Sequence, residues 1–172
     1  MRAPRMILVT LSIALFGISP TVLHGQSPLS PEHERIDFLV GEWQTVSEFA
    51  DGRSARGALS YEWVLGGAWM KVHFDGDHPD GGVWEAHGMQ RWNPETEEYE
   101  AHVYAGSGPP VTYRGSSDGP GHFGVALTTD SGSSGIDYHR QDDGTVYQEN
   151  WVIEGGERRI TLRTRYHPAS PP

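Results

Sequence analysis

The sequence predicts an all-β fold, an antiparallel meander barrel of about ten strands with a short N-terminal helix. Short runs of alternating apolar and polar residues recur at regular spacing from Glu42 onward, separated by Gly, Pro and Asp. No long amphipathic helical pattern interrupts them, and nearly every connection has the length of a hairpin. Because closure removes exposed strand edges that promote aggregation, we expect a closed barrel.

The N-terminus has the pattern of a secretory signal peptide over residues 1–25. Arg2 and Arg5 supply the positive start, and residues 7–18 form an apolar stretch too short to span a bilayer. We therefore expect an exported protein, periplasmic or secreted, with no membrane span in the mature chain. Residues 26–31 are expected to form a polar leader, 32–167 the barrel domain, and 168–172 a disordered tail.

The composition limits the classes of partner. The chain has no cysteine, so an exported form relies on packing and strand pairing rather than on disulfides. Without Arg2 and Arg5, 11 of the 13 basic residues remain against 23 acidic ones, a net charge of −12 with histidine neutral. This charge disfavours nucleic acid and anionic membrane surfaces. The sequence does not predict an oligomeric state.

A short helix is expected before the first strand. Ser30 can cap it and Pro31 suits the first helical position, so residues 31–35 are predicted to be helical. An apolar patch follows at residues 36–39, and Gly41 permits a tight entry into the strand. We interpret this segment as a plug that closes one end of the barrel. An ordinary helix-to-strand junction is the alternative.

The strand boundaries follow from the alternation and the turn residues. We expect strands at residues 42–49, 57–65, 68–75, 83–92, 99–104, 111–115, 122–128, 135–140, 146–153 and 158–166. In the last strand Leu162 and Tyr166 share the apolar face, so the arginines are expected to face outward. Arg165 and Tyr166 are adjacent and project oppositely. This argues against the inward Arg–Tyr pair with which fatty-acid-binding barrels hold a carboxylate.

Three short motifs resemble a bacterial family of uncharacterised domains. The motifs are Phe38-Leu39-Val40-Gly41-Glu42-Trp43, then Trp63-Val64-Leu65-Gly66-Gly67, then Gly88 through Trp92-Asn93 with Thr96 and Tyr99. That family is similar to the lipocalin-like, or calycin, β-barrels, and the match extends from about residue 36 to residue 166. The resemblance implies a lipocalin-like barrel of about ten strands around a central cavity. It implies no catalytic residues.

A more distant likeness is to the nitrobindin-type haem barrels, which share the Gly-x-Trp opening of Gly41 and Trp43. The sequence departs from them after Trp43, where residues 44–47 replace a glycine-rich continuation. A haem- or gas-binding barrel is therefore an alternative function, with His87 as the candidate iron ligand. The primary interpretation has no cofactor.

The nine histidines follow no metal-binding motif along the chain, so no metal site is predicted. Barrel closure could still bring some of them together, because His73, His87, His102 and His139 all lie in expected strands. For the strand at residues 83–92, either of its two faces could point into the barrel. One face has Val83, His87 and Met89, and the other has Trp84, Ala86, Gly88 and Trp92.

An enzyme acting on a small hydrophobic substrate is a further alternative. If Glu149 faced inward with Tyr147 and Trp151, it would be a buried carboxylate suited to general-base work. If Gln148 and Asn150 face inward, Glu149 faces outward. No motif of a serine hydrolase, phosphate loop or dinucleotide site is present. A non-catalytic protein is therefore favoured.

The aromatic residues favour a binding function. Six Trp and seven Tyr occur, many of them in expected strands, and an aromatic-lined cavity suits an apolar or planar ligand. Simple core filling in a structural or interaction barrel is the alternative. We predict an exported β-barrel that binds a small hydrophobic ligand. The residues expected to line its cavity are Trp43, Tyr61, Trp63, Met70, Phe74, His87, Tyr99 and Leu162.

Overall fold

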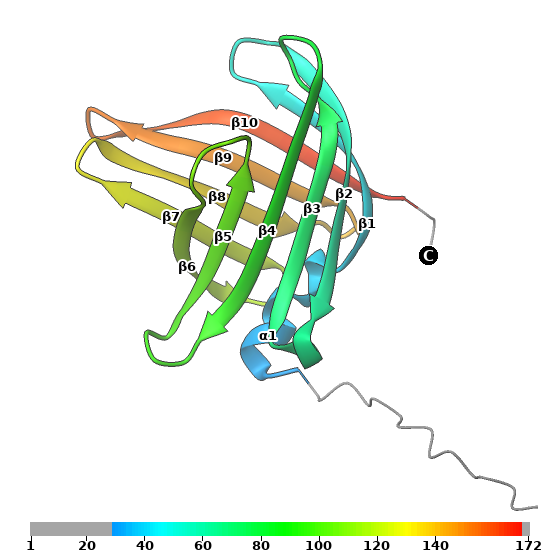
Figure 1. Cartoon of the computed structure of the whole chain (residues 1–172), viewed down its shortest axis with the longest axis vertical. Coiled ribbons are helices and arrows are strands. Elements are labelled where there is room, and N and C mark those ends of the chain that lie inside the picture. The colour runs from blue at the N-terminus through cyan, green and yellow to red at the C-terminus, as the bar shows by residue number, and fades with distance from the viewer. Residues whose placement is uncertain (1–28, 170–172) are drawn as a thin grey trace, which may run out of the picture.

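Ten antiparallel strands close into one barrel (Figure 1). The computed structural model describes residues 29–169. The strands are β1 (Gly41–Phe49), β2 (Ser54–Val64), β3 (Trp69–Asp77), β4 (Val83–Asn93), β5 (Glu98–Ala105), β6 (Val111–Gly119), β7 (His122–Thr129), β8 (Gly132–Arg140), β9 (Val146–Glu154) and β10 (Glu157–Pro168). The all-β, lipocalin-like fold class predicted from the sequence, with its short N-terminal helix, is confirmed.

The barrel is a meander. Each strand pairs with the next strand in the chain, and β1 closes the ring against β10. The closing ladder runs from Trp43 opposite Pro168 to Phe49 opposite Leu162. Every strand therefore has a neighbour on both sides, and the sheet presents no unpaired edge to a second chain.

Helix α1 (Pro31–Ile36) and the 3₁₀ turn η1 (Asp37–Leu39) lie at one end of the barrel (Figure 1). The Ser30 hydroxyl caps the helix by accepting a hydrogen bond from the His33 backbone N–H at 3.2 Å, as the sequence predicts. Ile36 and Leu39 are fully buried. Burial of such side chains stabilises the fold by about 1.5–3 kcal/mol each. The segment therefore forms the expected plug.

Four hydrogen bonds fasten the plug to the strands around it. They run from Trp43 Nε1 to the Leu39 carbonyl (2.8 Å), from Trp63 Nε1 to Asp37 Oδ1 (2.7 Å), from the Tyr99 hydroxyl to the Glu32 carbonyl (2.6 Å), and from the Trp92 backbone N–H to His33 Nε2 (3.2 Å). Burial lowers the pKa of His33. This favours the neutral imidazole, whose Nε2 can accept the bond from Trp92.

Most strand boundaries lie within two residues of the sequence prediction, and the larger differences are in β2, β6 and β8. β2 and β8 each begin three residues earlier than predicted, at Ser54 and Gly132. β6 continues to Gly119, with a register shift between Ser116 and Gly119, so the following turn is only two residues long. Residues 116–118 have the composition of a turn, but pairing with β7 extends the strand, since strand propensity depends on context. At the end of β2, Leu65 belongs to the 3₁₀ turn η2 (Leu65–Gly67), and its φ is positive at 52°.

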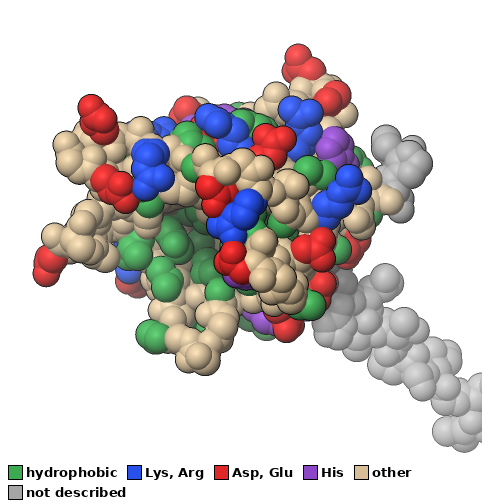
Figure 2. All heavy atoms as spheres, turned by 90° about the horizontal axis from the view of Figure 1, so that it is seen from above, with side chains coloured by type: hydrophobic (Ala, Val, Ile, Leu, Met, Phe, Trp, Pro, Cys, Tyr) green, Lys and Arg blue, Asp and Glu red, His purple; other side chains and the backbone are tan. Residues whose placement is uncertain are grey.

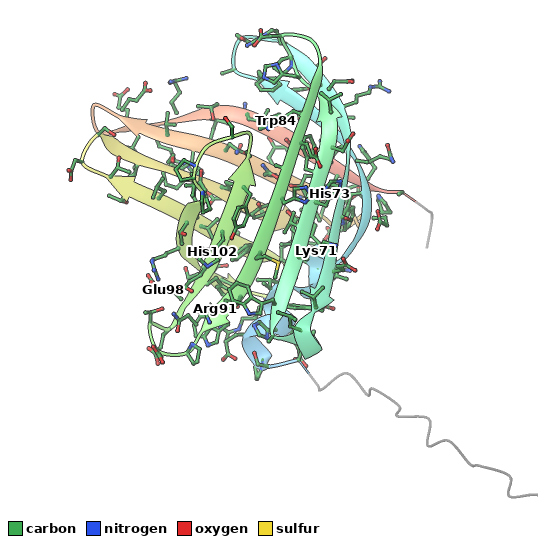
Figure 3. All side chains as sticks on the ribbon, viewed as in Figure 1. Lys71, His73, Trp84, Arg91, Glu98 and His102 are labelled. Atoms are coloured by element: carbon green, nitrogen blue, oxygen red, sulfur yellow. The ribbon has the colours of Figure 1, made fainter. Side chains whose placement is uncertain are left out.

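An ionic cluster on the outer wall joins β4, β5 and β6. The Glu100 side chain is only 7 % exposed and accepts hydrogen bonds from Asn93 at 3.1 Å, Arg91 at 2.9 Å and Arg114 at 2.6 Å. The bonds from Asn93 and then Arg91 lower the pKa of Glu100 to about 2. Arg91, labelled on β4 in Figure 3, also lies over the Trp69 ring at 4.8 Å. Glu100 therefore stays ionised although Arg91, Asn93 and Arg114 cover its side chain.

The expected signal peptide at residues 1–25 lies outside the described residues, as does most of the leader. Ser30 and Pro31, at the end of the expected leader, form the cap and first turn of α1, in agreement with the helix prediction. At the other end, the Ala169 N–H donates to the Glu42 carbonyl at 2.8 Å. Within residues 29–169, no helix has the length and apolar character needed to cross a membrane.

Candidate functional site

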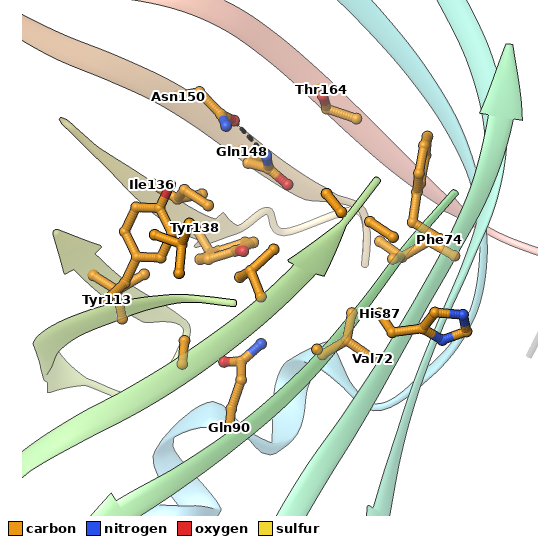
Figure 4. A pocket seen from close by; sticks show the side chains of 18 of the residues that line it. Val72, Phe74, His87, Gln90, Tyr113, Ile136, Tyr138, Gln148, Asn150 and Thr164 are labelled. Carbon is orange, nitrogen blue, oxygen red and sulfur yellow. Dashed lines mark hydrogen bonds between the residues drawn. The ribbon is translucent and has the colours of Figure 1, made fainter. Parts of the chain in front are cut away.

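A cavity of about 340 Å³ occupies the barrel interior beyond the plug. This volume lies near the lower limit of the roughly 300–1,000 Å³ typical of small-molecule sites. Trp84, Ala105 and Pro109 line the cavity. They belong to the start of β4, the end of β5 and the connection from β5 to β6, which lie at the barrel end remote from α1 (Figure 1). Figure 2, which looks at the molecule from above, shows hydrophobic side chains gathered in a hollow. Figure 4 shows the cavity from close by.

Strands β2 to β6 supply an apolar wall. Strand alternation turns one set of their side chains inward, and this set includes Leu59, Val72, Phe74, Val103 and Val111. The Phe74 ring packs edge-on against Trp84, with centroids 5.6 Å apart. It also covers Gly57 and Gly76, where a Cβ atom would approach the ring to 2.8 and 2.7 Å. The two glycines therefore make room for Phe74.

Strands β1, β10, β9 and β8 supply a facing polar stripe. Register places Ser47, Thr164, Gln148 and Tyr138 opposite one another in that strand order. Ser47 Oγ lies 2.9 Å from Thr164 Oγ1. Gln148 accepts a hydrogen bond from the Tyr166 hydroxyl and donates one to Asn150, the bond drawn in Figure 4. These bonds satisfy polar groups inside the barrel and hold their positions.

Four tyrosines line the cavity, and three of them, Tyr61, Tyr138 and Tyr166, are buried. Each of these three side chains is nearly inaccessible. Burial, with a further contribution from the neighbouring phenols, raises the pKa of all three well above the usual range. They therefore remain neutral at physiological pH and act as hydroxyl donors or acceptors.

Two polar atoms on the cavity wall have no hydrogen-bond partner among the described residues. They are Oε1 of Gln90 and Oγ1 of Thr45, from side chains that are 5 % and 2 % exposed. Figure 4 shows the Gln90 amide directed into the cavity. An unpaired buried polar atom costs about 1–3 kcal/mol. Both atoms are therefore candidate contact points for a bound molecule.

The cavity lining contains no Asp, Glu, Lys or Arg from the described part of the chain. Two histidines contribute to the wall, but their rings are engaged elsewhere. His102 hydrogen-bonds Thr112 at 3.0 Å and lies 5.8 Å from the Trp69 ring. His87 bonds Glu85 and His73. The interior is therefore neutral and amphipathic.

Apart from His87, the predicted cavity residues fall into two groups in the structure. Tyr61, Phe74 and Leu162 line the cavity, and their contact with a ligand remains a prediction. The other large side chains, contrary to expectation, lie outside the lining, in or against the core at the plug; they are Trp43, Trp63, Met70 and Tyr99. The reason is that closing the barrel end requires large aromatic side chains to pack on α1 and η1.

His87 borders the cavity, but the expectation that its ring enters the cavity is wrong. Its side chain is 53 % exposed, and Figure 4 shows the imidazole directed away from the cavity. Of the two faces left open for β4, the inward one has Trp84, Ala86 and Gly88. His87 is therefore on the outer face and cannot ligate a haem iron inside the barrel.

Glu149 also faces outward, where it accepts a hydrogen bond from Arg163 at 3.1 Å. Its neighbours Gln148 and Asn150 line the cavity. Glu149, the candidate general base, is therefore not in the cavity. Arg163 faces outward, as expected for the arginines of the last strand. The paired charges stay near solvent, where desolvation is small.

Sequence reasoning missed three polar residues of the site, Gln90, Thr45 and Thr164, and placed Gln148 inward only as one of two alternatives. The available signal was their alternation with residues of known direction. Gln90 follows Trp84, Ala86 and Gly88 at steps of two, and period-two alternation would have identified it once that face was chosen.

Comparison with solved structures finds β-barrels. One is a redesigned β-barrel, mFAP0, bound to DFHBI, with 11 % identity and a TM-score of 0.43, covering 76 % of this chain and 98 % of that chain. Another is a de novo designed fluorescence-activating β-barrel, with 15 % identity and a TM-score of 0.40, covering 78 % of this chain and 97 % of that chain. These likenesses concern the fold alone. No curated protein matches the sequence.

The match to a family model covers residues 28–164, which includes every strand from β1 to β9 and most of β10. The match confirms the predicted resemblance to an uncharacterised family, while the distant nitrobindin likeness remains a prediction. The chain belongs to the family described as protein of unknown function, DUF1579.

Proposed function

We propose that this protein is an exported binding protein that holds one small, uncharged and mainly apolar molecule inside the barrel. The observation that carries the proposal is the neutral, amphipathic cavity of about 340 Å³. Export rests on the signal-peptide pattern of residues 1–25. Ligand pockets are mostly apolar with a few placed polar groups, and this cavity has that composition.

The absence of charge from the cavity lining of residues 29–169 argues for an uncharged ligand. An ionised carboxylate or ammonium taken from water into this interior would lose its hydration without gaining a counter-charge. Such a transfer is costly unless the charge is paired. Fatty acids and organic cations are therefore disfavoured, in agreement with the outward Arg163.

The polar atoms define where the ligand carries its own polar groups. Gln90 Oε1 accepts hydrogen bonds only, so an N–H or O–H group of the ligand would satisfy it. Thr45 Oγ1 can donate or accept on the facing side. The apolar wall around Val72 and Phe74 suits a flat hydrocarbon face. A planar molecule with at least one hydrogen-bond donor on its edge satisfies all three contacts.

Two fluorescent probes that share one carbon skeleton test the proposal. N-phenyl-1-naphthylamine is uncharged, and 1-anilinonaphthalene-8-sulfonate adds only a sulfonate. We expect saturable binding of the uncharged probe at one molecule per chain. The sulfonate should bind at least tenfold more weakly, because an unpaired buried charge costs more than the roughly 1.4 kcal/mol that corresponds to a factor of ten. Equal affinity for both probes would refute the uncharged-ligand proposal.

A matched pair of variants locates the binding. Ala86 lines the cavity, whereas Met89 lies on the outer set of the same strand. Ala86→Phe should abolish probe binding by filling the cavity, and Met89→Phe should leave it unchanged. Circular dichroism checks that both variants fold. Native mass spectrometry of the gently purified protein then shows whether a molecule from the host accompanies the wild-type chain and is lost from Ala86→Phe.

A further inference from the structure

The outer wall of β3 and β4 carries a converging group of His73, Glu85 and His87. His73 and His87 are direct register partners across the two strands. Their Nδ1 atoms lie 3.2 Å apart, and their ring centroids 4.6 Å. His87 Nε2 lies 3.1 Å from Glu85 Oε1. The pairing unites residues whose separation along the chain matches no metal-binding motif.

The spacing of the two nitrogen atoms suits a single metal ion. With metal–nitrogen bonds of about 2.0–2.1 Å, two nitrogens 3.2 Å apart subtend an angle of about 100° at the ion. This angle lies between the values for neighbouring ligands in square-planar and tetrahedral coordination. Water can occupy the remaining positions, since both rings lie on the solvent side of the sheet. Imidazole is a preferred ligand of zinc, copper and nickel.

Glu85 prepares His87 for this function. A carboxylate only accepts hydrogen bonds, so His87 Nε2 carries the proton in the contact with Glu85. The lone pair of the neutral ring is then on Nδ1, the atom that faces His73. A carboxylate behind a ligating histidine fixes the ring tautomer and raises its basicity in many metal sites. Glu85 is therefore a positioning residue.

The surroundings of the group favour a cation. Register places Asp75 opposite Glu85 on the same outer face. Ser60 from β2 and Tyr104 from β5 face the two histidines without adding positive charge. Lys71, one step further along β3 and labelled with His73 in Figure 3, is paired with Glu62 at 2.7 Å. A metal ion therefore meets a region with an excess of acidic groups.

We propose that the outer wall of the barrel binds one divalent transition-metal ion of the class that imidazole prefers, with Nδ1 of His73 and Nδ1 of His87 as its protein ligands. The site is separate from the cavity, because His73 and His87 alternate with the inward residues Phe74 and Ala86 on the same strands. It therefore stands or fails independently of the proposed ligand.

A second histidine pair in the chain provides a control. His122 and His139 are also register partners, on β7 and β8. Their rings stack, with centroids 4.5 Å apart and an interplanar angle of 23°, and His122 Nδ1 is bonded to Asp118. The His73 and His87 rings are inclined at a similar angle, 35°, but their Nδ1 atoms are in direct contact at 3.2 Å. Among the described residues, no such contact joins the ring nitrogens of His122 and His139, whose only ring-nitrogen bond is the one to Asp118. This pair is not expected to bind the ion.

The test is titration calorimetry with zinc chloride on the untagged full chain, in a buffer that does not bind zinc. We expect one zinc per wild-type chain. His73→Ala and His87→Ala should each weaken binding at least tenfold, and His122→Ala should leave it unchanged. Glu85→Gln should weaken it by about tenfold, the lower end of the range for such supporting groups, while retaining the stoichiometry.

Copper supplies a readout that structural damage does not mimic. Electron paramagnetic resonance of the Cu²⁺-loaded wild type should show hyperfine coupling to two nitrogens, and His87→Ala should show one. No zinc binding by the wild type would overturn the proposal. So would undiminished binding in both His73→Ala and His87→Ala, or a loss in His122→Ala equal to theirs. Urea unfolding of each variant confirms that the barrel is intact.

Discussion

Replacing Gln90 by methionine should make the folded protein more stable and its binding weaker. Gln90 is 5 % exposed, and its Oε1 atom has no partner among the described residues. Methionine has a similar length and shape without the amide. The substitution therefore removes the cost of an unpaired buried oxygen while largely preserving packing.

The expected gain is about 1–2 kcal/mol in the free energy of unfolding, toward the lower part of the range for an unsatisfied buried group. For a domain of this size each kcal/mol raises Tm by about 2–4 °C. Affinity should change in the opposite direction. The amine N–H of N-phenyl-1-naphthylamine loses its acceptor, and binding should weaken by about three- to tenfold, as expected for one neutral hydrogen bond.

Gln148→Met is the matched control, because it removes the same chemical group from the same cavity. Gln148 accepts from the Tyr166 hydroxyl and donates to Asn150. Its loss removes both of these hydrogen bonds inside the barrel and should lower the free energy of unfolding by about 1–3 kcal/mol. Urea denaturation followed by tryptophan fluorescence measures both variants. If Gln90→Met is destabilised as much as Gln148→Met, then the Gln90 amide is satisfied in solution and the reasoning fails.

Three further predictions concern the scaffold. Glu100→Gln should lower the free energy of unfolding, measured by chemical denaturation, by about 1–3 kcal/mol. The folded pKa of Glu100, about 2, lies below the ordinary carboxyl value. The stability difference between wild type and variant should therefore be complete near neutral pH and shrink as the pH falls toward 2. Because the pKa of His33 is lowered in the folded state, the stability of the wild type should fall as the pH drops below the ordinary histidine value. His33→Gln keeps an acceptor for the Trp92 N–H, so its stability should fall less over the same pH range in urea titrations. Gly135→Ala should lower the free energy of unfolding by about 1–3 kcal/mol, and with it Tm, since its Cβ would lie 2.3 Å from the Trp151 ring. Gly108→Ala, with open space around it, is the control and should change the free energy of unfolding by less than about 0.5 kcal/mol. Equal Tm values for the two variants would contradict the packing argument.

The fold was predictable because its signals are local. Alternation and turn residues identify the strands, and hairpin-length connections leave neighbouring strands little choice except to pair in order. The plug was predictable for the same reason, since Ser30 caps α1 within three residues of itself. β6 shows the limit of local signals. Residues 116–118 have turn composition, yet their pairing partner β7 keeps part of them in the sheet.

The site was less predictable because two separate quantities place a side chain: whether it points into the barrel, and its height, which is its position along the barrel axis. Alternation indicates that Trp43 and Tyr61 face inward, but it does not indicate how far each lies from the plug. Height depends on the stagger between strands as the sheet closes, which is a property of the whole barrel. Trp43 consequently bonds the Leu39 carbonyl at the closed end. Tyr61 instead reaches the cavity.

The same reasoning explains why sequence analysis found no metal motif. Such motifs describe ligands close together along the chain, whereas His73 and His87 meet only through the β3–β4 ladder. The ladder gives each strand two independent faces. On β4, Ala86 and Gly88 keep the inner face small enough to leave a cavity, and His87 between them presents its ring to solvent. One stretch of three residues can therefore belong to two sites with different chemistry, and substitutions at 86 and 87 should separate them: Ala86→Phe should remove probe binding and keep zinc binding, and His87→Ala should do the reverse.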